Sequence, residues 1–134
     1  MLPPVEPVVS SPWLYRITLM LALVLFLLFI WGGNQPEAAG LIPPPWDKLI
    51  HLAWFTVLAG LLYFGLGLRH RAWVVMFCVS VALWDEWRQL TLPGRSAGLD
   101  DLLFDGLGIG VGAWLAGWLG VLFSSFPERE KQQE

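Results

Sequence analysis

The chain has 134 residues, of which 56% are hydrophobic, 14% aromatic and 14% charged. Soluble domains carry roughly 25% charged residues, so this composition argues against an ordinary soluble enzyme, and the aromatic content excludes a disordered chain. Nucleic-acid-binding domains are strongly basic, so the formal net charge of -3 gives no sign of a nucleic-acid partner. The single cysteine, Cys78, lies in an apolar run and is expected to be a buried hydrophobic residue.

The first predicted helix covers residues 14–33. Twenty uncharged residues separate Arg16 from Glu37, and about 20 apolar residues are enough for a helix to cross a bilayer. A cleaved signal peptide is the alternative interpretation of such a segment. The residues before it carry one Arg balanced by one Glu, and no small-x-small cleavage site stands ahead of Gly40. The sequence therefore favours a helix that remains as a membrane anchor.

Three more spanning helices are predicted over residues 47–68, 72–92 and 101–126. The second follows from a run of twenty residues without Asp, Glu, Lys or Arg, in which His51 alone is ionisable. Only thirteen residues separate Arg71 from Asp85, so the third helix must continue through charged residues. Backbone polar groups in lipid need internal hydrogen bonds. We therefore expect an all-α integral membrane bundle of four transmembrane helices, a single domain over residues 1–134 with a short polar C-terminal tail.

The basic residues predict how these helices are oriented. Four spans place both termini and the middle loop on one side of the membrane. That side holds Arg16, Arg69, Arg71, Arg129 and Lys131. The other side holds Lys48, Arg88 and Arg95. Because cytoplasmic loops are enriched in Lys and Arg, we expect both termini in the cytoplasm.

Polar residues converge at the opposite, extracytoplasmic end of the predicted bundle. Asp47 and His51 are four residues apart and share one face of a helix, as do Asp85 and Gln89. The second helix begins, the third ends and the fourth begins at this end. Ionisable groups at membrane depth usually face the bundle interior, where they pair or do work. We predict a pocket with these ligand-binding residues: Asp47, Lys48, His51, Asp85, Glu86, Gln89, Arg95, Asp101 and Asp105.

A ridge of small residues follows the last two of these acids along the fourth helix. Its members stand at four-residue intervals: Gly108, Gly112, Ala116 and Gly120. Such a ridge lets helix backbones approach closely. Since Asp101 and Asp105 extend the same ridge, we expect their side chains to point at neighbouring helices. The same ridge is also a possible contact between two copies of the chain, in a homo-oligomer.

A structural interpretation of the polar residues stays open. Five acids and three bases could form a self-neutralising ion network that only locks the bundle. His51 could be a neutral core residue, Arg88 could extend to the surface, and Asp100 could cap the fourth helix. A single His without an H-x-x-x-H or Cys pair predicts no metal site, and no cofactor-binding motif is present.

The polar motifs resemble the VanZ-like family of small bacterial membrane proteins. The resemblance covers residues 14–123 and rests on D-K-x-x-H from Asp47, D-E-x-x-Q from Asp85, and P-G-R from Pro93 followed by an acid and the glycine ridge. Two positions depart from the family pattern: Asp105 stands where Asn is usual, and Gly98 where Ser is frequent. The resemblance implies a multi-pass protein of the bacterial inner membrane and cell envelope, in a family named for low-level resistance to the glycopeptide teicoplanin.

Two functions compete on these residues. In the first, the pocket binds a membrane lipid head group or a lipid-linked cell-wall precursor, with Lys48 and Arg95 contacting its phosphate or carboxylate. In the second, a membrane-embedded enzyme acts on a lipid-linked phosphate or sugar. Its candidate catalytic residues are His51, Asp47, Glu86 and Asp105, with Asp47 orienting the His51 ring. A transporter is less favoured, because the other half of each span lacks acids and bases.

Overall fold

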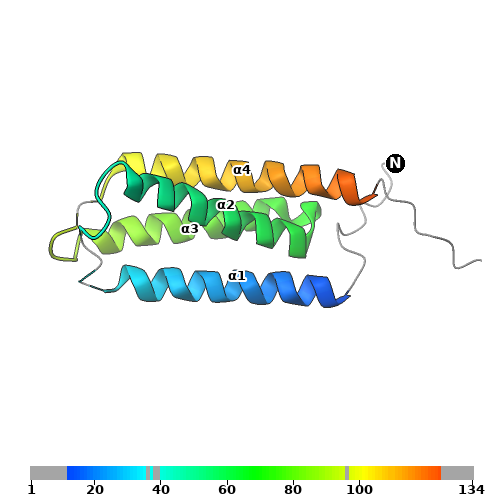
Figure 1. The fold of residues 1–134 in the computed structure, drawn as a ribbon, viewed down its shortest axis with the longest axis horizontal. Coiled ribbons are helices and arrows are strands. Elements are labelled where there is room, and N and C mark those ends of the chain that lie inside the picture. Colours follow the sequence, from blue (N-terminus) through cyan, green and yellow to red (C-terminus); the bar gives the residue numbers. More distant parts are fainter. Residues whose placement is uncertain (1–11, 36, 38–39, 96, 125–134) are drawn as a thin grey trace, which may run out of the picture.

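A computed structural model describes residues 12–35, 37, 40–95 and 97–124. Within them the chain forms four α-helices and one 3-10 turn: α1 (Pro12–Gly33), α2 (Trp46–Leu66), η2 (Leu68–His70), α3 (Arg71–Gln89) and α4 (Leu99–Ser124). Figure 1 shows the four α-helices side by side, in an antiparallel bundle. The prediction of an all-α chain with four long helices is confirmed. The last two residues predicted for the fourth helix and the polar tail lie outside the described residues.

The third helix is shorter than predicted, ending at Gln89 instead of about residue 92. Tighter turns replace the helical hydrogen bonds there, because the backbone N–H groups of Thr91 and Leu92 donate to carbonyls three residues back. Pro93 disfavours a helical conformation for the residue before it. The chain therefore turns back toward α4 within a few residues.

Three of the four helices are long and apolar enough to cross a membrane: Pro12–Gly33, Trp46–Leu66 and Leu99–Leu122. The predicted span over residues 72–92 corresponds to α3, which is not among these three helices. This 19-residue helix carries Arg71, Asp85, Glu86 and Arg88, so it does not qualify by composition. Its polar last turn nevertheless faces inward, since Asp85, Glu86, Arg88 and Gln89 are all buried.

The core lies where α2, α3 and α4 meet. Its largest fully buried apolar side chains are Phe55, Leu58 and Val74, and Cys78 is completely buried beside them, as predicted. Large apolar side chains cover the outer surface of every α-helix instead of being hidden, among them Leu23, Trp73 and Trp118. Such a surface suits acyl chains as the surrounding solvent.

The closest helix packing joins α2 and α4, and the glycine ridge makes it possible. A Cβ atom added at Gly108 would collide with the backbone oxygen of Leu52, and one at Gly112 would collide with the backbone oxygen of Thr56. Ala116 is buried as well. This part of the ridge is therefore covered by α2 within a single chain.

Candidate functional site

The polar residues gather at one end of the bundle. Figure 1 shows that α1 ends, α2 begins, α3 ends and α4 begins at this end, while η2 lies at the other. The described residues of the two loops at this end are 34–35, 37, 40–45, 90–95 and 97–98. Polar side chains from α2, α3 and α4 are thus brought to one depth, as the sequence predicts, and we call this end the polar mouth.

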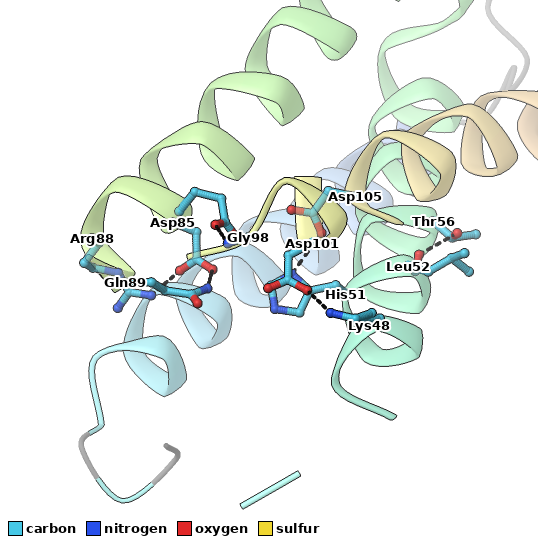
Figure 2. A network of polar contacts seen from close by, with 11 residues as sticks. Lys48, His51, Leu52, Thr56, Asp85, Arg88, Gln89, Gly98, Asp101 and Asp105 are labelled. Carbon is cyan, nitrogen blue, oxygen red and sulfur yellow. Dashed lines mark hydrogen bonds and ion pairs between the residues drawn. The ribbon is translucent and has the colours of Figure 1, made fainter. Parts of the chain in front are cut away.

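Asp85 organises the last turn of α3. Arg88 Nη2 donates to Asp85 Oδ1, and Gln89 Nε2 donates to Asp85 Oδ2 at 2.8 Å, so both carboxylate oxygens have partners. Figure 2 shows the three side chains turned toward one another. The carboxylate thereby orients the two side chains that follow it by one helical turn.

Arg88 joins α3 to the end of α1. Its Nη1 donates to Asn34 Oδ1 at 2.6 Å, and its guanidinium carbon lies 5.0 Å from the centre of the Trp84 ring. A Cβ atom at Gly33 would overlap the guanidinium group, so glycine here leaves room for the Arg88 side chain in this position. The expectation that Arg88 extends to the surface is wrong. Only 8% of the residue is exposed, because the buried Asp85 carboxylate and the Asn34 side chain supply acceptors.

Glu86 fastens the loop at residues 90–98 to α3. Its Oε2 accepts a hydrogen bond from the backbone N–H of Gly98 at 2.8 Å, and its Oε1 is buried with no partner among the described residues. A Cβ atom at Gly98 would collide with Asp100 Oδ1. Gly98 is one of the two positions where the chain departs from the family pattern, and a side chain there would require the Asp100 carboxylate to move.

Lys48 bridges the first turns of α2 and α4. Its Nζ forms ion pairs with Asp100 and Asp101, the latter at 3.1 Å. Because α4 begins at Leu99, Asp100 lies inside the first helical turn instead of capping the helix as expected. A carboxylate in that turn complements the positive end of the helix dipole.

One turn further along both helices, His51 and Asp105 form a second bridge. His51 Nδ1 lies 2.9 Å from Asp105 Oδ1, and Asp105 is only 1% exposed. Figure 2 shows Asp101 and Asp105 both directed toward α2, as predicted. The expected partner of His51 was Asp47, which shares its helical face. The structure pairs His51 with Asp105 instead, because the glycine ridge draws α4 against α2.

A cavity of about 780 Å³ opens at the polar mouth. Seven of the nine predicted ligand-binding residues line it: Asp47, Lys48, His51, Asp85, Gln89, Arg95 and Asp101. Glu86 and Asp105 do not line the cavity; they lie behind it and hold Gly98 and His51. Among the described residues, no three His, Cys, Asp or Glu side chains are grouped so that they could hold a metal ion.

Arg95 differs from the other two bases of the polar mouth. Lys48 and Arg88 are each paired with carboxylates. Arg95 lines the cavity without an ion pair to any described residue, and its Nε is buried with no hydrogen-bond partner there. Asp47 Oδ1 is likewise buried and unpaired within that part of the chain. The cavity wall therefore offers one positive and one negative group to a ligand.

Two residues of the site were missed by sequence reasoning. Asn34, which binds Arg88, directly follows α1 and resembles an ordinary loop residue. Trp54 lines the cavity, and its indole Nε1 is a buried donor without a partner among the described residues. Its position three residues after His51, on the same helical face, was a usable signal.

The sequence was compared with known proteins. No curated protein and no solved structure matches it. A model of the family described as VanZ/LLP1 matches residues 12–121. The match runs through all four helices and includes every residue that lines the cavity. This chain is therefore a multi-pass membrane protein that belongs to the VanZ/LLP1 family.

Proposed function

We propose that the polar mouth binds the phosphate-bearing head group of a membrane lipid or of a lipid-linked cell-wall precursor. The observation that carries this proposal is Arg95, a base at the cavity wall with no acid partner in the described part of the chain. Arginine binds phosphate through paired, charge-assisted hydrogen bonds. Lys48 and Arg88 already have acid partners, so Arg95 is the base of the polar mouth that a ligand anion would pair.

The acids of the cavity indicate what else the head group carries. Asp47 has a buried, unpaired oxygen, and Asp100 and Asp101 share a single lysine. Carboxylates accept hydrogen bonds and repel a bare anion. The proposed ligand therefore combines a phosphate with hydroxyl or ammonium donors, as in glycerol, ethanolamine or sugar phosphates.

Replacing Arg95 by glutamine tests this proposal. We expect R95Q to bind phosphatidylglycerol about 10–100-fold more weakly than the unmodified protein, because a hydrogen bond to a charged group contributes about 1.5–3 kcal/mol. Lipid retained by the purified proteins is measured by native mass spectrometry. The matched control is R69Q, which removes an exposed base within η2, at the other end of the bundle. Equal lipid binding by R95Q and R69Q contradicts the proposal.

The resemblance to VanZ-like proteins extends this experiment to cells. A precursor held at the polar mouth would connect the chain to teicoplanin resistance. Expression in a sensitive bacterium should then raise the inhibitory concentration of teicoplanin, and R95Q should abolish the increase while R69Q retains it. If R95Q still raises the inhibitory concentration of teicoplanin, resistance does not depend on ligand binding at this cavity.

The proposal includes a fourth span and an orientation. We propose that α3 crosses the bilayer of the bacterial cytoplasmic membrane with the other helices, that both termini are cytoplasmic, and that the polar mouth faces outward. The support is that α3 buries its polar last turn while Trp73, Met76 and Leu83 remain exposed to acyl chains.

Labelling of single cysteines tests this orientation. In a C78A background, a membrane-impermeant maleimide added to intact cells should modify L41C, at the polar mouth, and leave R69C unmodified. Both positions are exposed. Permeabilised cells, in which both variants should react, provide the control. Modification of R69C alone in intact cells would show that the orientation is the opposite of the one we propose.

A second candidate function rests on His51 and Asp105. A histidine that is oriented by a buried carboxylate and lines a cavity can accept or donate a proton during catalysis. The protein would then act on a lipid-linked phosphate or sugar. The purified protein should release product from polyprenyl phosphates or lipid-linked sugars, and H51Q should lose this activity. No turnover across such a panel, with divalent metals supplied, contradicts the enzymatic function.

A further inference from the structure

We infer that the ligand is an intact amphiphile that reaches the polar mouth from within the bilayer, with its chain lying between α1 and α2 and its head group at Arg95. This inference deepens the proposed function and rests on it. It excludes a water-soluble head group, such as a free sugar phosphate, as the natural ligand of this cavity.

The cavity has two chemically different walls. Its polar wall is formed by side chains of α2, α3 and α4 at the polar mouth, which were described above. Its apolar wall is formed by Leu28 and Phe29 of α1, Ile50 and Trp54 of α2, and Leu41 and Ile42 of the loop between those helices. A soluble head group would leave the apolar wall in contact with water. An acyl or prenyl chain would cover it, at a gain of roughly 25 cal/mol for each Å² of apolar surface buried.

The apolar wall continues to the outer surface of the bundle. Leu28 is 49% exposed and Ile50 is 42% exposed, although both line the cavity. Among the helices, α1 packs mainly against α2, so these two residues lie on neighbouring helices that flank the same opening. The path that we infer for the chain therefore runs from the bilayer into the cavity past Leu28 and Ile50.

The boundary between the two walls carries a hydrogen-bond donor. Trp54 lies one turn beyond His51 on α2 and packs against Phe29 with 5.9 Å between ring centres. Its Nε1–H has no partner among the described residues. Lipids carry ester, ether or phosphoester oxygens at the same relative place, between the head group and the chain. Trp54 is positioned to donate to such an oxygen.

Gly32 offers a way to block the chain without disturbing the fold. It lines the cavity, and a Cβ atom added there would meet no atom within 4 Å. A leucine at this position would occupy the space that we assign to the chain. Gly110 of α4 provides the matched control. A Cβ atom there also meets nothing within 4 Å, and Gly110 is not part of the cavity wall.

The experiment compares G32L, G110L and R95Q with the unmodified protein. Binding of dioleoyl phosphatidylglycerol is measured by native mass spectrometry, and binding of glycerol 3-phosphate by NMR titration. We expect G32L to bind the lipid about tenfold more weakly than G110L, which matches the loss of one or two buried methylene contacts. Glycerol 3-phosphate should bind G32L and G110L equally. R95Q should bind both the lipid and glycerol 3-phosphate more weakly than the unmodified protein.

Two results separate the inference from the proposed function. If G32L and G110L bind the lipid equally while R95Q is impaired, the chain path is wrong and the head-group site stands. If R95Q binds the lipid as well as the unmodified protein does, the proposed function itself fails. Should G32L not fold, photocrosslinking of the unmodified protein with phosphatidylglycerol that carries a diazirine in its acyl chain decides the question. Adducts at residues 28–32 and 50–54 support the path, and adducts confined to the outer faces of α3 and α4 overturn it.

Discussion

Replacing His51 by leucine should lower the free energy of unfolding by about 3–5 kcal/mol, the usual cost of removing one partner of a buried charged pair. Asp105 is only 1% exposed, and its Oδ2 already lacks a partner among the described residues. In H51L its other oxygen would lose the 2.9 Å contact to the imidazole as well. The carboxylate would then remain in the interior with neither water nor a partner.

Cys78 provides the measurement for this prediction. Its thiol is fully buried, so a thiol-reactive fluorophore reports unfolding of the detergent-purified protein during a thermal scan. D105N should change the free energy of unfolding very little, because the amide keeps a hydrogen-bonding group beside His51 and removes the charge. The double variant H51L/D105L should recover most of the stability that H51L loses, since neither of the two positions then carries an unpaired polar group. If H51L unfolds at the temperature of the unmodified protein, Asp105 is not held by this contact.

Gly108 is the second position where a small change should have a large effect. G108A should destabilise the bundle by about 1–3 kcal/mol, the range for overpacking a close-packed interior. The added methyl group would collide with the Leu52 backbone oxygen and lie 3.1 Å from both Phe55 Cβ and the Thr56 backbone nitrogen. Two of these atoms belong to the backbone of α2, so a change of side-chain rotamer cannot relieve the contact. The α4 helix must move away.

The control for this prediction is G110A. A Cβ atom at residue 110 meets nothing within 4 Å, and alanine is favoured over glycine in a helix by roughly 0.5–1 kcal/mol. The two variants therefore carry the same chemical change in the same helix and should shift stability in opposite directions. Equal midpoints in the Cys78 thermal scan would show that α4 does not touch α2 at Gly108. A loss of lipid binding in G108A is also expected, because Lys48 and His51 reach their acids only while α4 stays close.

The polar mouth combines features of the structural and functional interpretations. Lys48, His51 and Arg88 are held by acids, as expected for a network that locks the bundle. Arg95 and Asp47 face a cavity without such partners among the described residues. A network meant only for stability gains nothing from buried groups that stay unpaired, since each costs free energy. In the proposed function, the paired residues fix the shape of the cavity, and the unpaired groups of Arg95 and Asp47 bind the ligand.

Local sequence patterns were enough to place the four helices, apart from the end of α3, and to predict at which end the polar residues meet. Charge-free runs of about twenty residues fix where a chain can enter lipid, and these boundaries are local properties of the chain. Asp101 and Asp105 stand at four-residue intervals from the ridge glycines, and residues four apart share one helical face. This spacing predicted that both side chains point at a neighbouring helix. The same four-residue spacing of small residues predicted that α4 packs closely against a neighbouring helix.

The tertiary structure alone decided which residues pair. The bridges from Lys48 to Asp101 and from His51 to Asp105 join residues 53 and 54 positions apart. Such contacts depend on the rotation and depth of one helix against another, which no local pattern contains. This is why the two arginines differ. The rotation of α3 places Arg88 beside Asp85 and Asn34. The turn after α3 places Arg95 at the cavity, where no carboxylate of the described residues forms an ion pair with it.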